Sequence, residues 1–301
     1  MLQGWGRGTS GLMRGDACRM SPTLITLVLL AALLHASWNA VIKMSGDRFL
    51  TMAMVMGVGS LAAVPLLPWL PLPAPDSRAF LGLSALIHVA YYFFLISAYR
   101  VGDLSHVYPL ARGTAPLLVA TGAWFFAGER LGPLQLAGLL LVFGAIVAFA
   151  FESGRGAGWN PRPLLFGLGT AVLIGAYTVT DGIGVRRTGT PLSYIAWLFF
   201  IDGLPLAVFA LLTRRAQLVP FLRVYWRAGI AGGLMSALAY ALVIWALSLG
   251  QMAYVSALRE TSVVFAALIG ARMLHEPFAG RRLFLAALVA SGIVFMSLPG
   301  A

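Results

Sequence analysis

Ten apolar runs of about 20 residues each follow one another along the chain, with short polar links between them. A helix of about 20 apolar residues crosses the roughly 30 Å hydrocarbon core of a bilayer. The chain is 60% hydrophobic and 10% charged, whereas soluble domains carry about 25% charged residues. The sequence therefore predicts an all-α integral membrane protein with ten transmembrane helices, near residues 23–43, 50–70, 79–98, 105–126, 133–151, 163–182, 191–212, 226–249, 252–273 and 282–298.

The links divide the chain into a tail and two halves. Residues 1–20 are rich in glycine and arginine and have no apolar face, so we expect a disordered N-terminal tail. The link GRGAGWNPRP follows the fifth span, and we expect one five-helix repeat over residues 21–152 and a second over residues 160–301.

The two halves share residues at a nearly constant spacing. Positions at a spacing of 148 residues match in the pairs Ala98 and Ala246, Gly102 and Gly250, Val107 and Val255, and Leu110 and Leu258. Glu129 and Glu276 match at 147. Such matches indicate an internal duplication. Because five is an odd number, the second repeat must enter the membrane in the opposite sense, which gives the inverted repeats typical of transporters.

Several partners and cofactors are excluded by what the sequence lacks. The single cysteine, Cys18, leaves no intramolecular disulfide, and no Cys/His pattern indicates a metal site. No GxxxxGK[ST] loop is present for a nucleotide. The net charge of +11 comes from arginines that flank apolar spans, which favours lipid headgroups over nucleic acid. We expect no cofactor, no metal, a small-molecule substrate, the lipid bilayer as surroundings, and a monomer or homodimer.

The pattern AGER-L-x(3)-Q-x(2)-G-x(5)-G, from Ala127 to Gly144, resembles the EamA-type module of the drug/metabolite transporter superfamily. His275–Glu276 and Ser291–Gly292 repeat part of it, although His275 and Pro277 depart from the pattern. The segments HASWNAVIK, SAYRVGDLSHVYPLARGTAP and SALRETSVVFAAL are similar to a subgroup associated with phosphonate utilisation. The resemblance implies secondary transport, often export of amino acids or other small metabolites, in the bacterial inner membrane.

The orientation of the chain is left open by two opposing observations. Lys and Arg number twelve in the odd-numbered links and seven at the N-terminus and in the even-numbered links. The positive-inside rule then places the N-terminus outside the cytoplasm. The family resemblance instead implies that both termini are cytoplasmic.

An arginine in the fourth span is the most unusual residue of the chain. Arg112 lies between Pro109 and Pro116, and two prolines permit a break in the helix. A guanidinium beside free backbone N–H groups would grip a carboxylate or phosphonate. The other interpretation is an ion pair that joins two helices. Pro109 and Pro116 are structural in both.

Arg259 and Glu260 occupy the equivalent place in the ninth span. As sequence neighbours they diverge by about 100° around a helix, so we do not expect them to pair with each other. Glu260 is a candidate for proton coupling and also a candidate partner of Arg112. Asp202, in the middle of the seventh span, is either a second proton-coupling residue or a partner of Arg112 or Arg259.

Other polar and aromatic side chains are placed to line a cavity. His35 and Asn39 share one face of the first helix with Trp38 beside them, and Tyr177 and Asp181 are similarly spaced in the sixth. Asp181 has a second interpretation, as a solvated residue at a helix end. The substrate-binding candidates are Arg112, His35, Asn39, Trp38, Tyr92, Tyr177, Tyr240 and Arg259.

Glu129 and Glu276 end the fourth and ninth spans. We interpret both as structural acceptors for the turn and for the N–H groups at the start of the next helix.

These observations favour a secondary active transporter for a small amphipathic or zwitterionic metabolite such as an amino acid or an aminophosphonate, and the resemblance implies the direction of export. A channel-like or sensory membrane protein is the alternative. An intramembrane lipid-modifying enzyme is disfavoured, because the HE pair at His275 has no second histidine four residues further on. We therefore expect no enzymatic activity.

Overall fold

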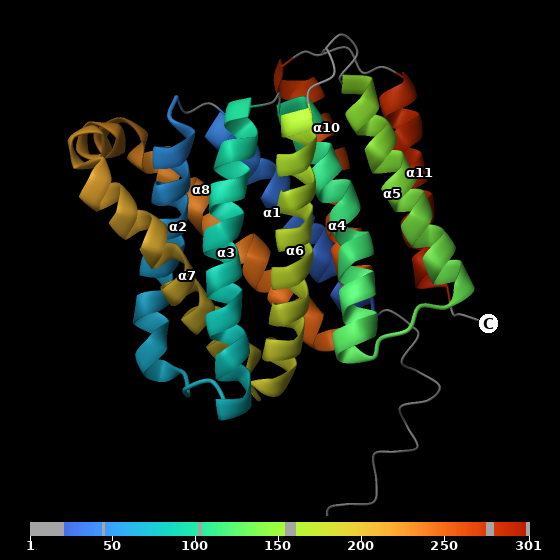
Figure 1. Cartoon of the computed structure of the whole chain (residues 1–301), viewed down its shortest axis with the longest axis horizontal. Coiled ribbons are helices and arrows are strands. Elements are labelled where there is room, and N and C mark those ends of the chain that lie inside the picture. Colours follow the sequence, from blue (N-terminus) through green and yellow to red (C-terminus); the bar gives the residue numbers. More distant parts are fainter. Residues whose placement is uncertain (1–20, 44–45, 102–103, 154–160, 275–279, 299–301) are drawn as a thin grey trace, which may run out of the picture.

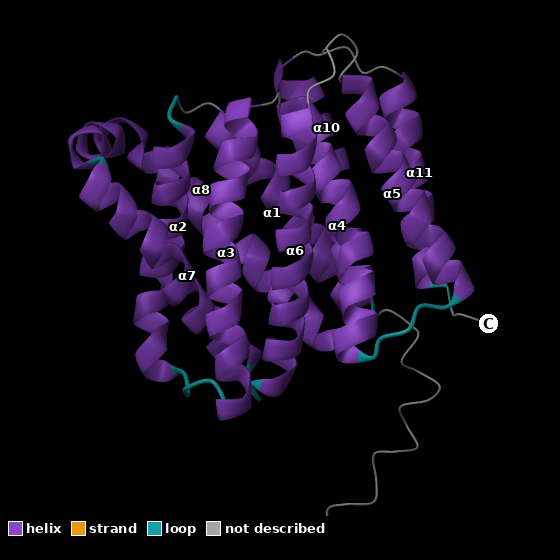
Figure 2. Cartoon of the chain, in the orientation of Figure 1, coloured by secondary structure: helices purple, strands orange, loops and turns teal. Residues whose placement is uncertain are grey.

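The computed structural model of the chain describes residues 21–43, 46–101, 104–153, 161–274 and 280–298. The predicted disordered tail, residues 1–20, lies outside this part. Within the described residues the chain is helical and forms no strand, as Figure 2 shows. The predicted all-α membrane architecture is confirmed.

The helices of the described residues account for the ten predicted spans, because α9 and α10 together occupy the ninth and η1 continues α2. Six helical segments of this part of the chain, α2 with η1 among them, are long and apolar enough to cross a bilayer, and others are shorter. The elements are α1 (Pro22–Lys43), α2 (Arg48–Ala63), the 3-10 helix η1 (Val64–Trp69), α3 (Pro75–Val101), α4 (Leu104–Ala127), α5 (Pro133–Ser153), α6 (Pro161–Arg187), α7 (Pro191–Thr213), α8 (Arg215–Leu249), α9 (Met252–Arg259), α10 (Thr261–Leu274) and α11 (Gly280–Ser297).

The second and eighth spans depart from the prediction at one end each. The α-helical part of the second span stops at Ala63, since Pro65 and Pro68 lack backbone N–H groups and the tighter η1 replaces it. The eighth span begins at Arg215 rather than near residue 226, so most of the predicted link before it is helical.

The helix break that we predicted in the fourth span is absent. α4 continues through Pro109 and Pro116, in keeping with the tolerance of membrane helices for proline where neighbouring helices support them. The break lies instead in the ninth span, at Glu260, between α9 and α10.

The break at Glu260 has a local cause in its hydrogen bonds. The Glu260 N–H donates to the Ala257 carbonyl, and the Val263 N–H donates to the Glu260 carbonyl, both three residues back and at 3.0 Å. The Thr261 hydroxyl also donates to the Leu258 carbonyl at 2.8 Å. Side chains of this kind compete with the helical hydrogen bonds of the backbone. The chain therefore makes a tight turn where a continuous helix was expected.

Helix contacts follow the two-fold relation between the repeats. Exchanging the repeats relates α1 to α6, α2 to α7, α3 to α8, α4 to α9–α10 and α5 to α11. The contact of α3 with α6 then corresponds to that of α8 with α1, and the contact of α4 with α6 to that of α10 with α1. α2 packs on α7 and α5 on α11, each on its own counterpart, and Figure 1 shows the latter pair side by side at one edge.

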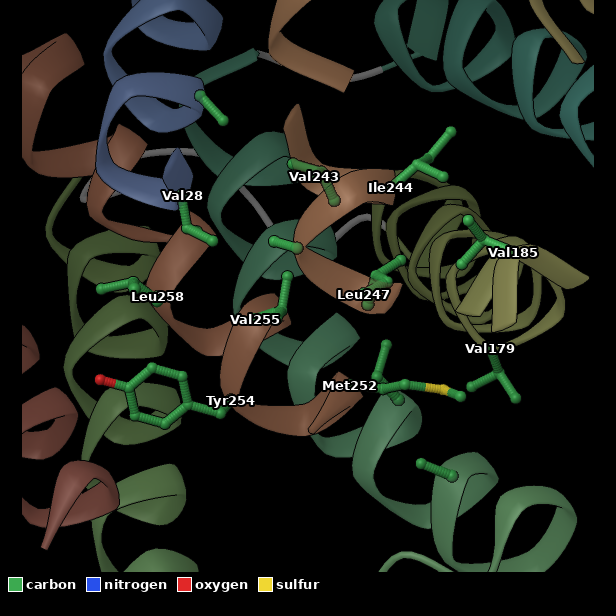
Figure 3. Close-up of a cluster of buried hydrophobic side chains, with 14 of the residues drawn as sticks. Val28, Val179, Val185, Val243, Ile244, Leu247, Met252, Tyr254, Val255 and Leu258 are labelled. Carbon is green, nitrogen blue, oxygen red and sulfur yellow. The ribbon is translucent and has the colours of Figure 1, made fainter. Parts of the chain in front are cut away.

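The largest apolar cluster surrounds the short helix α9. Figure 3 shows side chains of this cluster from α1 (Val28), α6 (Val179 and Val185) and α8 (Val243, Ile244 and Leu247), together with those of α9. From α9 itself the cluster takes Met252, Tyr254, Val255 and Leu258, all at most 3% exposed. This packing holds an eight-residue helix that would be too short to be stable alone.

The contact between α5 and α11 gives a prediction for stability. A Cβ atom on Gly138 would meet the Gly292 carbonyl oxygen and Met296 of α11. We expect Gly138→Ala to lower the stability of the folded protein by about 1–3 kcal/mol, because neither backbone can yield without separating the helices. Thermal unfolding of the purified protein measures this loss.

Gly144→Ala is the matched control on the same helix, since a Cβ there meets nothing within 4 Å. Its melting temperature should stay the same or rise, as alanine favours helix. Equal melting temperatures for the two variants would contradict the proposed close packing of α5 on α11.

Candidate functional site

A cavity of about 100 Å³ lies between the repeats and is lined by residues of α1, α2, α3, α4, α6, α7, α8 and α9. Seven of the eight predicted substrate-binding residues line it: Arg112, Arg259, His35, Trp38, Tyr92, Tyr177 and Tyr240. Asn39 does not, since its amide donates to the His35 carbonyl at 2.7 Å. The sequence therefore brings most of these side chains to one place.

Arg112 forms an ion pair with Glu260, as one of the two interpretations predicted. The distance from Arg112 Nε to Glu260 Oε2 is 2.9 Å, and the two side chains are 6% and 0% exposed. Arg112 Nη2 also donates to the Ser262 hydroxyl at 3.3 Å. The pair joins α4 of the first repeat to the helix break of the second. Because Arg112 also lines the cavity, its contact with substrate stays a prediction.

Arg259 lies closer to its sequence neighbour than we expected. Its Nε is 3.8 Å from Glu260 Oε1, because the helix ends at Arg259 and the divergence of a continuous helix no longer applies. Arg259 is 3% exposed, and its Nε and Nη2 make no hydrogen bond within the described residues. Glu260 thus lies between two arginines, and only Arg112 is at hydrogen-bonding distance. Proton exchange at Glu260 stays a prediction.

Asp202 does not pair with an arginine in the described part of the chain, so that interpretation is wrong. Its Oδ2 accepts a hydrogen bond from the Tyr92 hydroxyl at 2.7 Å, and its buried Oδ1 has no partner among the described residues. Asp202 lines the cavity. Its role in proton coupling stays a prediction.

Asp181 is fully buried, so the interpretation as a solvated helix end is wrong. α6 extends beyond the predicted end at residue 182 to Arg187, which places Asp181 inside the helix bundle. Its two oxygens accept hydrogen bonds from the Tyr194 hydroxyl at 2.9 Å and the Tyr240 hydroxyl at 2.5 Å.

His88 of α3 is a cavity residue that the sequence candidates left out. Its ring stacks on Tyr177 with centroids 4.1 Å apart and meets the edge of Tyr240 at 5.6 Å. His88 and Tyr92 are four residues apart, so both face the same side of α3. That spacing was the available signal. Phe199 and Ser60 also line the cavity.

Glu129 caps a helix, although not the next one along the chain. Its Oε2 accepts a hydrogen bond from the Met252 N–H at 2.8 Å, at the start of α9, where an anion is stabilised by the helix dipole. Its Oε1 is 2.7 Å from Arg186 Nη1. Arg186 also donates to the Leu247 and Gly250 carbonyls at the end of α8. Glu276 and the side chain of Pro109 lie outside the described residues; Pro116 is buried within α4.

Comparison with known families identifies the chain. A sequence model described as the EamA-like transporter family matches residues 23–151 and again residues 161–298.

The protein belongs to the EamA-like transporter family.

Membership of this family makes the protein a multi-pass membrane transporter of small molecules, within the drug/metabolite transporter superfamily. The family match does not separate subgroups, so the phosphonate-associated subgroup stays a prediction. No curated protein matches the chain.

A solved structure supports the fold of this EamA-like transporter. This structure, described only as "Crystal structure of protein", superposes with a TM-score of 0.75 at 20% sequence identity, over 92% of this chain and 97% of that chain. At this identity the likeness concerns the fold alone.

The charges around Glu260 give a prediction for the EamA-like transporter. Glu260→Gln leaves two buried arginines without an acid beside them, whereas Arg112→Gln leaves Glu260 with Arg259 at 3.8 Å. Breaking a buried pair costs about 3–5 kcal/mol when the remaining charge is uncompensated. We therefore expect Glu260→Gln to lower the melting temperature more than Arg112→Gln does. Thermal unfolding of the two variants, each purified from the same amount of membrane, measures the difference. Equal losses, or a larger loss in Arg112→Gln, would contradict this charge balance.

Proposed function

We propose that the protein is a secondary transporter that moves a small zwitterionic solute, such as an amino acid or an aminophosphonate, by alternating access. The proposal includes the direction of export and a place in the bacterial inner membrane, as the sequence resemblance implies. The solute occupies the cavity between the repeats.

The observation that carries this proposal is a pair of oppositely charged residues in one cavity whose hydrogen bonds are incomplete. Arg259 of α9 has two buried guanidinium nitrogens without hydrogen bonds among the described residues, and Asp202 of α7 has one such carboxylate oxygen. Both residues line the cavity. Buried polar groups are normally paired. A solute with one anionic and one cationic group would satisfy both residues at once.

The walls and the size of the cavity favour a small, partly apolar solute. Tyr91, Tyr92, Tyr177, Tyr240 and Phe199 surround the space between the charged ends. Aromatic faces attract an ammonium group as well as apolar carbon. The volume of about 100 Å³ is below the roughly 150 Å³ that holds a benzene molecule in a protein interior.

The contacts beside the cavity favour alternating access over a permanent pore. Ala31 and Val243 belong both to the cavity wall and to the apolar cluster around α9. The ion pair of Glu129 with Arg186 fastens the ends of α4 and α6 to the junction of α8 and α9 beyond that cluster. To open a path past these contacts, a rocking motion of the repeats would have to separate both the apolar cluster and this ion pair.

Exchange of labelled solutes across proteoliposomes tests the proposal. We expect exchange of L-alanine or 2-aminoethylphosphonate, and no exchange of propionate, ethylamine or ethylphosphonate, which each lack one charge. Charged hydrogen bonds contribute about 1.5–3 kcal/mol, so Arg259→Gln and Asp202→Asn should each raise KM by about tenfold or more.

Arg187→Gln is the control, since Arg187 is exposed at the end of α6 and lies over the Phe80 ring. It should exchange at the wild-type rate. Equal exchange of the singly charged analogues, or an unchanged KM in Arg259→Gln, would overturn the zwitterion proposal.

A further inference from the structure

The buried charges of the described interior do not balance. Tyrosines aside, the buried ionisable residues are two arginines, three carboxylates and one histidine: Arg112, Arg259, Asp181, Asp202, Glu260 and His88. With His88 neutral, these six described residues together carry one net negative charge. A net charge in the bilayer interior is costly. One additional bound proton makes this interior neutral.

The imbalance is located at Asp181 and Asp202. Glu260 is compensated by Arg112 at 2.9 Å. Asp181 and Asp202 form no ion pair with an arginine or lysine in the described part of the chain and are held by tyrosine hydroxyls instead. They belong to the second repeat, on α6 and α7, and His88 of α3 lies within electrostatic reach of both.

The hydrogen bonds of His88 show which of its ring nitrogens carries the hydrogen. Its Nδ1 lies 2.9 Å from the Ser84 carbonyl oxygen, which only accepts, so Nδ1 carries a hydrogen. The Ser84 hydroxyl is 3.2 Å from the same nitrogen. The Nε2 of His88 makes no hydrogen bond within the described residues.

His35, the other histidine of the cavity, is different. The indole N–H of Trp38 donates to His35 Nδ1 at 3.2 Å, and an indole nitrogen only donates. His35 Nδ1 is therefore an acceptor, and the ring is neutral.

We infer that Asp181 and Asp202 form a proton-binding site, which holds one proton whenever the interior is closed to water. The proton is held by one of these two carboxylates, and His88 of α3 lies near both. The groups that face this site are Tyr91 and Tyr92 of α3, Tyr177 of α6, Tyr194 of α7 and Tyr240 of α8, with His35, Arg112 and Arg259 around the same cavity. The inference concerns the folded protein itself, and it holds whichever solute is moved.

Thermal unfolding as a function of pH tests the site without any solute. A proton bound by the folded interior and released by the unfolded chain adds stability that is lost as the pH rises. Asp181→Asn removes one negative charge, so the interior of this variant is neutral without a bound proton. The stability of the variant should therefore not fall in this way as the pH rises. We therefore compare the melting temperature of Asp181→Asn with that of the wild type at each pH. The difference, variant minus wild type, should increase by about 2–4 °C or more between about pH 6 and pH 9.

Asp202→Asn removes the same charge on α7 and should gain on the wild type in the same way, which keeps the test open if one variant fails to fold. Asp76→Asn is the control, because Asp76 is exposed in the first turn of α3. Its difference from the wild type should not change over this pH range. The inference is overturned if the differences for Asp181→Asn and Asp202→Asn are equally independent of pH.

The solute-exchange assay separates this inference from the proposed function. Wild-type exchange should slow as the pH rises, and Asp181→Asn should remove that slowing, because its closed state needs no proton. Pyranine trapped in the vesicles confirms the internal pH. Absence of any exchange together with the expected thermal differences would reject the zwitterion transporter and keep the proton site. Exchange of the zwitterions together with pH-independent thermal differences would keep the zwitterion transporter and reject the proton site.

Discussion

The ion pair of Arg112 with Glu260 is the interaction around which the centre of the molecule is arranged. Both side chains are buried in a part of the protein where an unpaired charge would cost several kcal/mol. The pair connects the two repeats, since Arg112 lies on α4 and Glu260 between α9 and α10. Its geometry also depends on the break, which brings Arg259 to within 3.8 Å of the same carboxylate. Any motion that changes the angle between the repeats must change this arrangement.

The break at Glu260 affects the structure well beyond the ion pair. It leaves α9 as a helix of eight residues with two ends inside the protein. At its N-terminus the Met252 N–H is bound by Glu129, and at its C-terminus Arg259 lies where the helix dipole favours a cation. The apolar cluster around α9 supplies the remaining stability. One short helix therefore connects Glu129, just after the end of α4, to the charged wall of the cavity.

Much of this fold could be predicted from the sequence, because hydrocarbon thickness fixes the length of a span and the duplication fixes the relation between halves. The Arg112–Glu260 pair was also among the predictions. The break was misplaced, because α4 has two prolines and stays helical, whereas LRETS has neither proline nor glycine and turns through its own side-chain and backbone hydrogen bonds. The predicted partner of Asp202 was wrong for a different reason. α7 is almost wholly apolar, so its rotation about its own axis is set by the neighbouring helices, and they turn Asp202 toward Tyr92.

If the interior closes only when neutral, the charge of the solute decides how protons enter the cycle. The empty cavity holds one proton on Asp181 or Asp202. A zwitterion adds no net charge, so the loaded and empty states carry the same proton and a pH gradient changes the rate without driving the solute uphill. A cation would take the place of the proton, and the two would then be exchanged one for one. An anion would need a second proton and would travel with it. The same set of buried residues thus links solute charge to energy coupling.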